Sequence, residues 1–188
     1  VNLMQISERS TQEIRFTSKK LQKNKFVECL YFADSLGSMN SQNISDKIKI
    51  IKQDFFKEIG IHTHDNLGKA LTNTTTAVSK GVNWIDSTVY GMGRGPGNLK
   101  TEISLIEIAR SKKYLKNLDS MMHLITEYFL PLHKKYNWGT NPFYYLAGKY
   151  KIHPTDIQTM LSDKVFDFSI ISKIVESLKK VDSSSFNP

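Results

Sequence analysis

The sequence contains one cysteine, few arginines and no long apolar run. Cys29 lies in the apolar segment FVECLYFAD, cannot form an internal disulfide, and is expected to be a small buried residue in a reducing compartment. No apolar stretch approaches the about 18 residues that cross a bilayer, and no signal-peptide pattern opens the chain. These absences argue against a membrane protein and predict a soluble protein of the cytoplasm.

The positive charge does not have the pattern of a nucleic-acid-binding protein. The formal net charge is +8, but only four of the 26 basic residues are arginines, and the lysines are scattered over predicted helix faces. Nucleic-acid readers usually concentrate Arg and Lys in one patch, with aromatic platforms or a recognisable module. Neither is visible here. The charge therefore predicts a solvated lysine surface, with no nucleic-acid partner.

The first part of the chain alternates short apolar runs with helical patterns. The predicted strands are VNLMQIS (1–7), KFVECLYFAD (25–34), IGIHTHD (59–65) and GVNWIDSTV (81–89). A polar helix is predicted around 11–22 after the first strand, and apolar residues at helical spacing predict helices over 44–55, 67–81 and from 103 to 109 after the others. Four consecutive strand–helix units imply right-handed crossovers and a parallel sheet. The predicted fold class is therefore α/β.

The remainder of the chain is predicted to be helical. Beyond about residue 113 no strand pattern recurs, and apolar stripes mark helices over 121–132 and 170–178. Pro142 and Pro154 each stand where a new helix can begin. The aromatic and methionine stripes fit a hydrophobic core better than a cofactor site. We therefore expect two domains, an α/β domain over 1–113 and a helical domain over 114–188.

Each strand–helix turn carries a polar cluster, and one cluster contains two histidines. Parallel α/β sheets and barrels collect active-site groups at the carboxyl ends of their strands, where QISERS, DSLGS, HTHDN and GMGRGPGN all fall. Since side chains alternate along a strand, His62 and His64 project the same way and could share one metal ion. Zinc, iron, nickel and manganese all accept imidazole. The alternative is an ordinary hydrogen-bonded strand end.

Three ordered motifs resemble those of a known enzyme family. ADSLGSM, IGIHTHDNLGKALTNTTTAVSKG and IDSTVYGMGRGPGNLKTE are similar, in order and spacing, to the pyruvate-dependent metal aldolases of the DRE-TIM metallolyase (HMGL-like) superfamily. The similarity is greatest to the 4-hydroxy-2-oxovalerate aldolases. It covers residues 1–113 well and the helical tail weakly, through AGKYKIHPTDI.

The resemblance implies a (β/α)8 TIM barrel followed by a helical domain. It also implies a divalent metal, Mn²⁺ or Mg²⁺, held by His62 and His64. The family's third protein ligand is an Asp in an R-D motif on the first barrel strand, and no such strand is visible here. VNLMQIS corresponds to the fourth strand, so the chain resembles the C-terminal half of a barrel, strands four to seven or eight. A start at Val1 suits a fragment, a processed product or part of a longer polypeptide.

Further site residues follow from the resemblance alone. Ser35 matches a serine that binds the carboxylate of pyruvate, although a turn residue or helix cap is an alternative. Asn98 matches a position at or near the metal, and would otherwise be an N-cap. Arg94, in a flexible glycine loop, could meet a substrate carboxylate or phosphate, or could be a plain surface residue. A tyrosine of the helical domain acts near the reacting hydroxyl, for which Tyr136 and Tyr144, and also Tyr145, are candidates.

The expected reaction is reversible cleavage of a 4-hydroxy-2-oxo acid into pyruvate and an aldehyde. The glycine loop lacks the Glu of the isopropylmalate-synthase branch and the Cys of the hydroxymethylglutaryl-CoA lyase branch. KKYNWGTNPFYYLAGKY is more similar to aldolase-type proteins associated with surface-polysaccharide pathways, so the substrate can differ. The alternatives are a Claisen-type acyltransferase or lyase, and a catalytically incomplete half-barrel that acts as an assembly module.

The expected partners follow from the half-barrel and from the resemblance. A half-barrel exposes two sheet edges, a liability that closed barrels remove, so we expect association with a missing N-terminal half or with a second copy. The family resemblance adds a keto-acid substrate and an aldehyde dehydrogenase as a possible partner enzyme.

Overall fold

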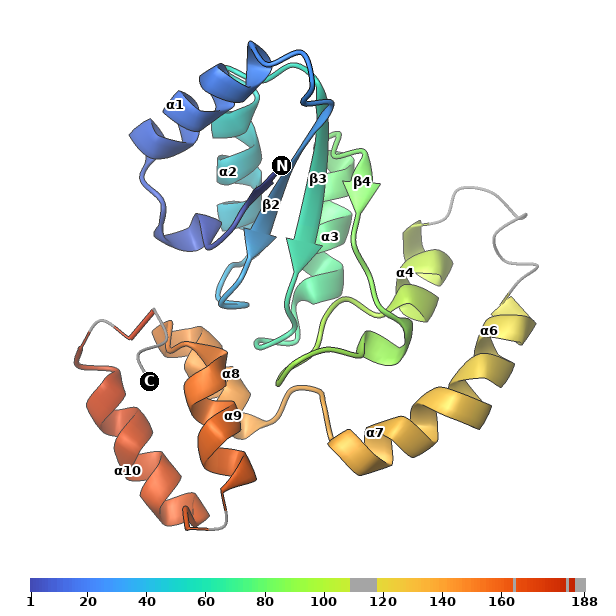
Figure 1. Cartoon of the computed structure of the whole chain (residues 1–188), viewed down its shortest axis with the longest axis vertical. Helices are drawn as coiled ribbons and strands as arrows, with labels where there is room; N and C mark the ends of the chain where they lie inside the picture. The colour runs from blue at the N-terminus through green and yellow to red at the C-terminus, as the bar shows by residue number, and fades with distance from the viewer. Residues whose placement is uncertain (109–117, 164, 182, 185–188) are drawn as a thin grey trace.

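A computed structural model describes residues 1–108, 118–163, 165–181 and 183–184, and its centre is a parallel sheet (Figure 1). The strands are β1 (Asn2–Leu3), β2 (Cys29–Asp34), β3 (Glu58–Thr63) and β4 (Trp84–Ile85), paired in the order β1-β2-β3-β4. Neighbouring strands are parallel, which confirms the predicted α/β class. Strands in simple chain order are typical of a (β/α) barrel, whereas a doubly wound sheet reverses its order.

The outer strands are shorter than the sequence predicts. β1 and β4 have two residues each, because the chain turns into short 3₁₀ helices soon after them. These are η1 (Ile6–Glu8) after β1 and η2 (Val89–Gly91) after β4. The predicted strands 1–7 and 81–89 were therefore right in place and wrong in length.

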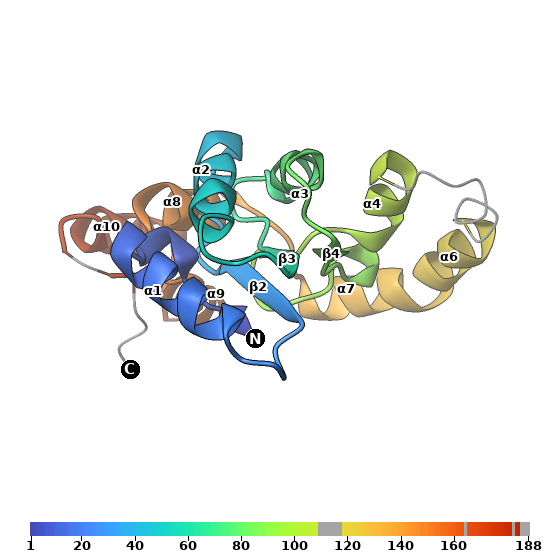
Figure 2. The ribbon, with the colours of Figure 1, turned by 90° about the horizontal axis from the view of Figure 1, so that it is seen from above.

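A helix follows each strand, as expected. These are α1 (Thr11–Gln22), α2 (Ser41–Ile51), α3 (Ala70–Ser79) and α4 (Thr101–Ile108). Consecutive helices contact one another, and Figure 2 shows α2 and α3 side by side along the sheet. Ala109, predicted to end the last of these helices, and the predicted domain boundary at 113 lie outside the described residues.

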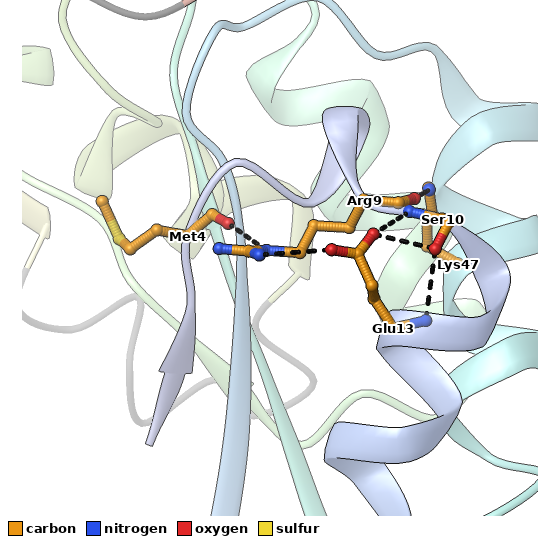
Figure 3. A network of polar contacts seen from close by, with 5 residues as sticks. All are labelled: Met4, Arg9, Ser10, Glu13 and Lys47. Carbon is orange, nitrogen blue, oxygen red and sulfur yellow. Dashed lines mark hydrogen bonds and ion pairs between the residues drawn. The ribbon is translucent and has the colours of Figure 1, made fainter.

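The start of α1 is held by a polar network (Figure 3). The Ser10 hydroxyl accepts a hydrogen bond from the Glu13 backbone N–H at 3.2 Å, and the Ser10 N–H donates to Glu13 Oε2 at 2.8 Å. This reciprocal pair is a capping box. Arg9 Nε donates to the Met4 carbonyl, and Lys47 Nζ of α2 donates to the Arg9 carbonyl at 2.8 Å. The network therefore ties β1, α1 and α2 together.

The main hydrophobic core lies between the sheet and the helices. Side chains of one sheet face pack against α1, α2 and α3. The large buried ones include Leu30, Phe32, Ile59 and Ile61 of the strands and Ile44 and Ile48 of α2. Each such side chain stabilises the fold by about 1.5–3 kcal/mol relative to an exposed one. Because side chains alternate along a strand, the other sheet face carries Tyr31, Gly60, His62 and Trp84. That face is only partly covered, since Trp84 is 54 % exposed.

The second part of the described chain is helical. It comprises α6 (Leu118–Leu124), a π-helix (Ile125–Phe129), α7 (Leu130–Tyr136), α8 (Pro142–Tyr150), α9 (Pro154–Ser162) and α10 (Phe168–Leu178). Pro142 and Pro154 begin α8 and α9, as predicted. The predicted helix over 121–132 is real but passes through the π-helical turn. Figure 1 shows α7, α8 and α9 beyond the carboxyl ends of the strands.

The helical part has a core of its own and a polar junction with the sheet. Ala147, Ile152, Ile157, Ile171 and Val175 are buried together. Asn66, in the turn after β3, donates from Nδ2 to the Tyr144 carbonyl at 3.3 Å, and its own carbonyl accepts from Thr140 Oγ1 at 2.7 Å. The turn that follows the two histidines is thus bonded to α8. No helix in the described part of the chain is long and apolar enough to span a membrane.

Candidate active site at the carboxyl ends of the strands

His62 and His64 lie next to each other where β3 ends. His62 is the penultimate residue of β3, and His64 follows the strand and forms an isolated bridge with Asn98. The two ring centroids are 5.0 Å apart and the rings are nearly perpendicular. The alternation of side chains thus places both imidazoles on the same side, as the sequence predicts.

Hydrogen bonds orient each imidazole through its Nδ1 atom. His64 Nδ1 lies 3.1 Å from the carbonyl oxygen of Asp34, and His62 Nδ1 lies 3.2 Å from Asp86 Oδ2. Both partners are acceptors, so Nδ1 is the donor in each ring, and Nε2 is the nitrogen that could bind a metal. Histidines that bind metals usually have this arrangement, with the second nitrogen held by a carbonyl or carboxylate.

The protonation state of His64 also suits a metal ligand. Burial lowers the pKa of His64 to about 4, and the charges of His62 and Arg94 act in the same direction. His64 is therefore neutral at pH 7, and only a neutral imidazole can coordinate a cation.

Two aspartates that were not predicted as site residues hold the histidines in place, Asp34 through its backbone carbonyl and Asp86 through its carboxylate. Asp34 is fully buried, and its carboxylate accepts backbone hydrogen bonds from Ser38 at 3.0 Å and Met39 at 3.1 Å. Burial raises the pKa of Asp34 to about 6, against the opposing effect of these hydrogen bonds. Asp86 follows β4. Both residues stand at the carboxyl end of a strand, so the rule that singled out the histidines could have found them.

Ser35 lies beside this pair, in the turn after β2. Its side chain is nearly buried, with 8 % exposure, and its hydroxyl oxygen accepts a hydrogen bond from the Gln5 backbone N–H at 2.8 Å. The hydroxyl proton remains available for donation to another group. Ser35 directly follows Asp34, whose carbonyl binds His64, so the structure places Ser35 at the same edge of the sheet.

The glycine loop is joined to the end of β3 by backbone hydrogen bonds. Asp65 N–H donates to the Gly97 carbonyl at 3.0 Å, and Leu99 N–H donates to the Thr63 carbonyl at 3.2 Å. Asn98 therefore lies beside His64, while its Nδ2 donates to the Met92 carbonyl at 3.1 Å. Asn98 does not cap a helix, since α4 begins only at Thr101.

Arg94 and two of the candidate tyrosines line one cavity on the other side of this loop. The cavity has a volume of about 540 Å³, and Tyr136 and Tyr144 contribute to its wall. Tyr144 is 4 % exposed, whereas Tyr136 is 61 % exposed. Tyr145, the third candidate, is not among the residues that line it.

The structure thus groups the candidate residues into two sets connected by the glycine loop. His62, His64, Ser35 and Asn98 gather at the strand ends, and none of them lines the cavity that contains Arg94, Tyr136 and Tyr144. Among the described residues, no group of three or more His, Cys, Asp or Glu side chains could hold a metal ion. The two imidazoles fit two positions of a divalent-metal shell, and any further ligands would have to be water, substrate or groups outside the described residues.

Comparison with known proteins identifies the family. The sequence model of the HMGL-like family matches residues 4–126. The chain belongs to the HMGL-like family. A 4-hydroxy-2-oxovalerate aldolase of Bacillus thuringiensis is 35% identical over 114 residues, which are 60% of this chain and 33% of that protein. One of Geobacillus thermodenitrificans is 31% identical over 133 residues, 70% of this chain and 39% of that protein. The chain thus matches about a third of the length of these HMGL-like relatives.

Solved structures confirm the barrel-type fold. The N-terminal domain of a putative aldolase from Bacteroides vulgatus is similar with a TM-score of 0.72 and 29% identity, over 92% of this chain and 56% of that one. The HMG-CoA lyase of Bacillus subtilis has a TM-score of 0.58 at 20% identity, over 73% of this chain and 49% of that one. The second likeness concerns the fold alone. Both support the predicted TIM-barrel type of fold.

Proposed function

We propose that this chain supplies the metal-binding strand ends of a divalent-metal-dependent aldolase. The reaction is the cleavage or formation of a 4-hydroxy-2-oxo acid from pyruvate and an aldehyde. The observation that carries the proposal is the pair of imidazoles with both Nδ1 atoms held by acceptors and both Nε2 atoms available. Relatives named 4-hydroxy-2-oxovalerate aldolase add support for the reaction class.

His62 and His64 would hold Mn²⁺ or Mg²⁺ through their Nε2 atoms, and Asp34 and Asp86 would keep both rings in place. When bound, the ion supplies a Lewis acid that polarises the carbonyl of the keto acid. The Ser35 hydroxyl, which still has a proton to donate, would bind the keto-acid carboxylate.

The second set of residues would act on the aldehyde side of the substrate. The glycine loop between the two sets lets backbone N–H groups approach the substrate closely. Asn98, which belongs to the first set, would lie at the metal because its backbone pairs with that of His64. Tyr144 or Tyr136 would stand near the reacting hydroxyl. Of the two, Tyr144 is the better-fixed candidate because it is buried against the loop.

The site also requires a partner. Within the described sheet β1 and β4 each pair with one neighbour only, and on the sheet face opposite the helices Trp84 is 54 % exposed. We propose that further barrel strands or a second copy of the chain cover this face, and that residues from about 114 onward form a separate helical domain. An aldehyde dehydrogenase partner, expected from the resemblance, stays a prediction.

Titration of the purified chain with Mn²⁺ in a calorimeter tests the metal site. We expect weak binding, because two imidazoles are an incomplete ligand set. His64→Ala should weaken it at least ~10-fold, since even loss of a group supporting a metal ligand costs about 10–100-fold. His123→Ala, which removes an exposed imidazole from α6, is the matched control and should bind as the wild type does. Equal binding by the two variants would show that the metal is held elsewhere.

An activity assay separates the aldolase from a Claisen-type enzyme. The complete enzyme is supplied with Mn²⁺ and either pyruvate plus an aldehyde or pyruvate plus acetyl-CoA. We expect product only in the first mixture. Product only in the second mixture would contradict the aldolase proposal, and product in neither would favour the alternative of an assembly module.

A further inference from the structure

The cavity beside the glycine loop has a lining of polar and apolar residues with one charged side chain. Its wall is formed by the loop on one side and by helices α8 and α9, with the segment before α8, on the other. Figure 1 shows the green loop that follows β4 reaching towards these helices. Among the residues that the structure describes, Arg94 is the only charged one in the lining, and none of the lining residues is an aspartate or glutamate.

Two side chains of this lining, those of Arg94 and Asn141, present hydrogen-bond donors to the cavity. Asn141 Oδ1 already accepts the backbone N–H groups of Phe143 and Tyr144, at 2.9 and 3.0 Å, so its amide NH₂ is what remains. Arg94 offers five N–H donors and no acceptor. It forms no ion pair with any residue that the structure describes. Such a surface is complementary to a ligand that presents several acceptor oxygens and a negative charge.

The cavity is fixed in position relative to the histidines. Gly95 has a φ of +59°, and its carbonyl accepts a hydrogen bond from Gly139 N–H at 2.9 Å. A Cβ atom at Gly95 would lie 3.1–3.3 Å from the ring and hydroxyl of Tyr144, so the loop is in close contact with α8. A few residues further along the same loop, Asn98 pairs with His64. A molecule extended along the loop would thus have one end at the histidines and the other in the cavity.

We propose that this cavity binds the far end of the aldehyde part of the substrate and that this end carries an oxyanion, either a carboxylate or a phosphate. The identification of the ligand as an aldehyde rests on the proposed aldolase function, whereas the preference for an oxyanion rests on the lining alone. Arg94 makes a bidentate contact to the oxyanion, and Asn141 donates a further hydrogen bond. Aldehydes with a short apolar chain leave the donors of Arg94 and Asn141 without a partner and therefore bind less tightly.

The proposal is tested by NMR titration of the ¹⁵N-labelled chain in metal-free buffer. The probes are glyceraldehyde 3-phosphate for a phosphate, succinic semialdehyde for a carboxylate, and glyceraldehyde and butanal as neutral counterparts. We expect one or both charged probes to shift the resonances of Gly95 and of the Asn141 and Gln158 side-chain amides, with saturation. The neutral probes should bind at least ~10-fold more weakly, because a charge-assisted hydrogen bond is lost.

Substitutions at Arg94 distinguish this site from general attraction to a basic protein. Arg94→Gln should weaken binding of the charged probe ~10-fold or more, and Arg94→Lys should restore part of it, since charge is kept and the bidentate geometry is lost. Arg9→Gln replaces an exposed arginine of the β1–α1 turn and is the matched control. It should not change the affinity for the charged probe. Circular dichroism confirms that each variant is folded.

Three results would overturn the proposal: equal binding of charged and neutral probes, wild-type affinity of Arg94→Gln, or shifts centred on Lys49, Lys52 and Lys80 of the α2–α3 surface instead of the cavity. Because no metal is present, the titration is independent of the metal site. Oxyanion binding without Mn²⁺ binding would contradict the aldolase function alone, and the reverse would contradict this inference alone.

Discussion

Gly148 is the residue at which the contact between α8 and the sheet can be tested most directly. It lies inside α8, where an alanine would ordinarily stabilise the helix by about 0.5–1 kcal/mol. A Cβ atom there would, however, lie 2.9 Å from the Asn66 Cβ, 3.0 Å from the Gly37 carbonyl oxygen and 3.1 Å from Leu67 Cγ. We therefore predict that Gly148→Ala destabilises the protein.

The size of the effect follows from two opposing contributions. Overpacking of a close contact typically costs about 1–3 kcal/mol, and none of the three neighbours is the free end of a flexible side chain. With the gain in helix propensity subtracted, the free energy of unfolding should fall by about 1–2 kcal/mol. At roughly 2–4 °C per kcal/mol for a chain of this size, the melting temperature should fall by about 2–8 °C.

Urea denaturation of the wild type, Gly148→Ala and Lys149→Ala measures the change in the free energy of unfolding. Lys149 is the exposed neighbour in the same helix, and its substitution should change the free energy of unfolding by less than about 0.5 kcal/mol. If Gly148→Ala were instead as stable as the wild type or more so, α8 would not pack against the turns after β2 and β3. The positions of Tyr144 and Asn141 beside the glycine loop would then be wrong as well.

Two further predictions concern stability. Ser10→Ala removes the capping box of α1 and should lower the free energy of unfolding by ~1 kcal/mol in urea denaturation, whereas Gln12→Ala, exposed on the same helix, should be neutral. The pH dependence tests the burial of Asp34 and His64. The pKa of Asp34 is raised from 3.8 to about 6 on folding, which destabilises the fold as pH rises through that range. The pKa of His64 is lowered from 6.5 to about 4, which stabilises the fold as pH rises through nearly the same range. The two effects oppose each other, so the free energy of unfolding of the wild type should vary little between pH 4 and 6. Asp34→Asn should leave a rise of about 3 kcal/mol from pH 4 to 6.5, and a flat profile for this variant would contradict the burial of His64.

The order of the helices and strands was predictable because its causes are local. The capping box of Ser10 and Glu13 places the start of α1 at Thr11, and the fixed φ of proline places α8 and α9 at Pro142 and Pro154. The lengths of β1 and β4 were not predictable. A strand continues only as far as its neighbour supplies hydrogen-bond partners, and that depends on register with a distant segment.

Some features of the candidate site also follow from the sequence alone, and others depend on the tertiary structure. Side chains alternate along a strand, so the H-x-H sequence alone determined that His62 and His64 lie on one side of the sheet, and the motifs alone indicated the family. Only the tertiary structure decided that the Asp34 carbonyl and the Asp86 carboxylate orient the two rings, and that Arg94 shares a cavity with Tyr144. These contacts join residues far apart in the chain, and no local pattern specifies the distance between them, because it depends on how the strands pair and how the helices pack.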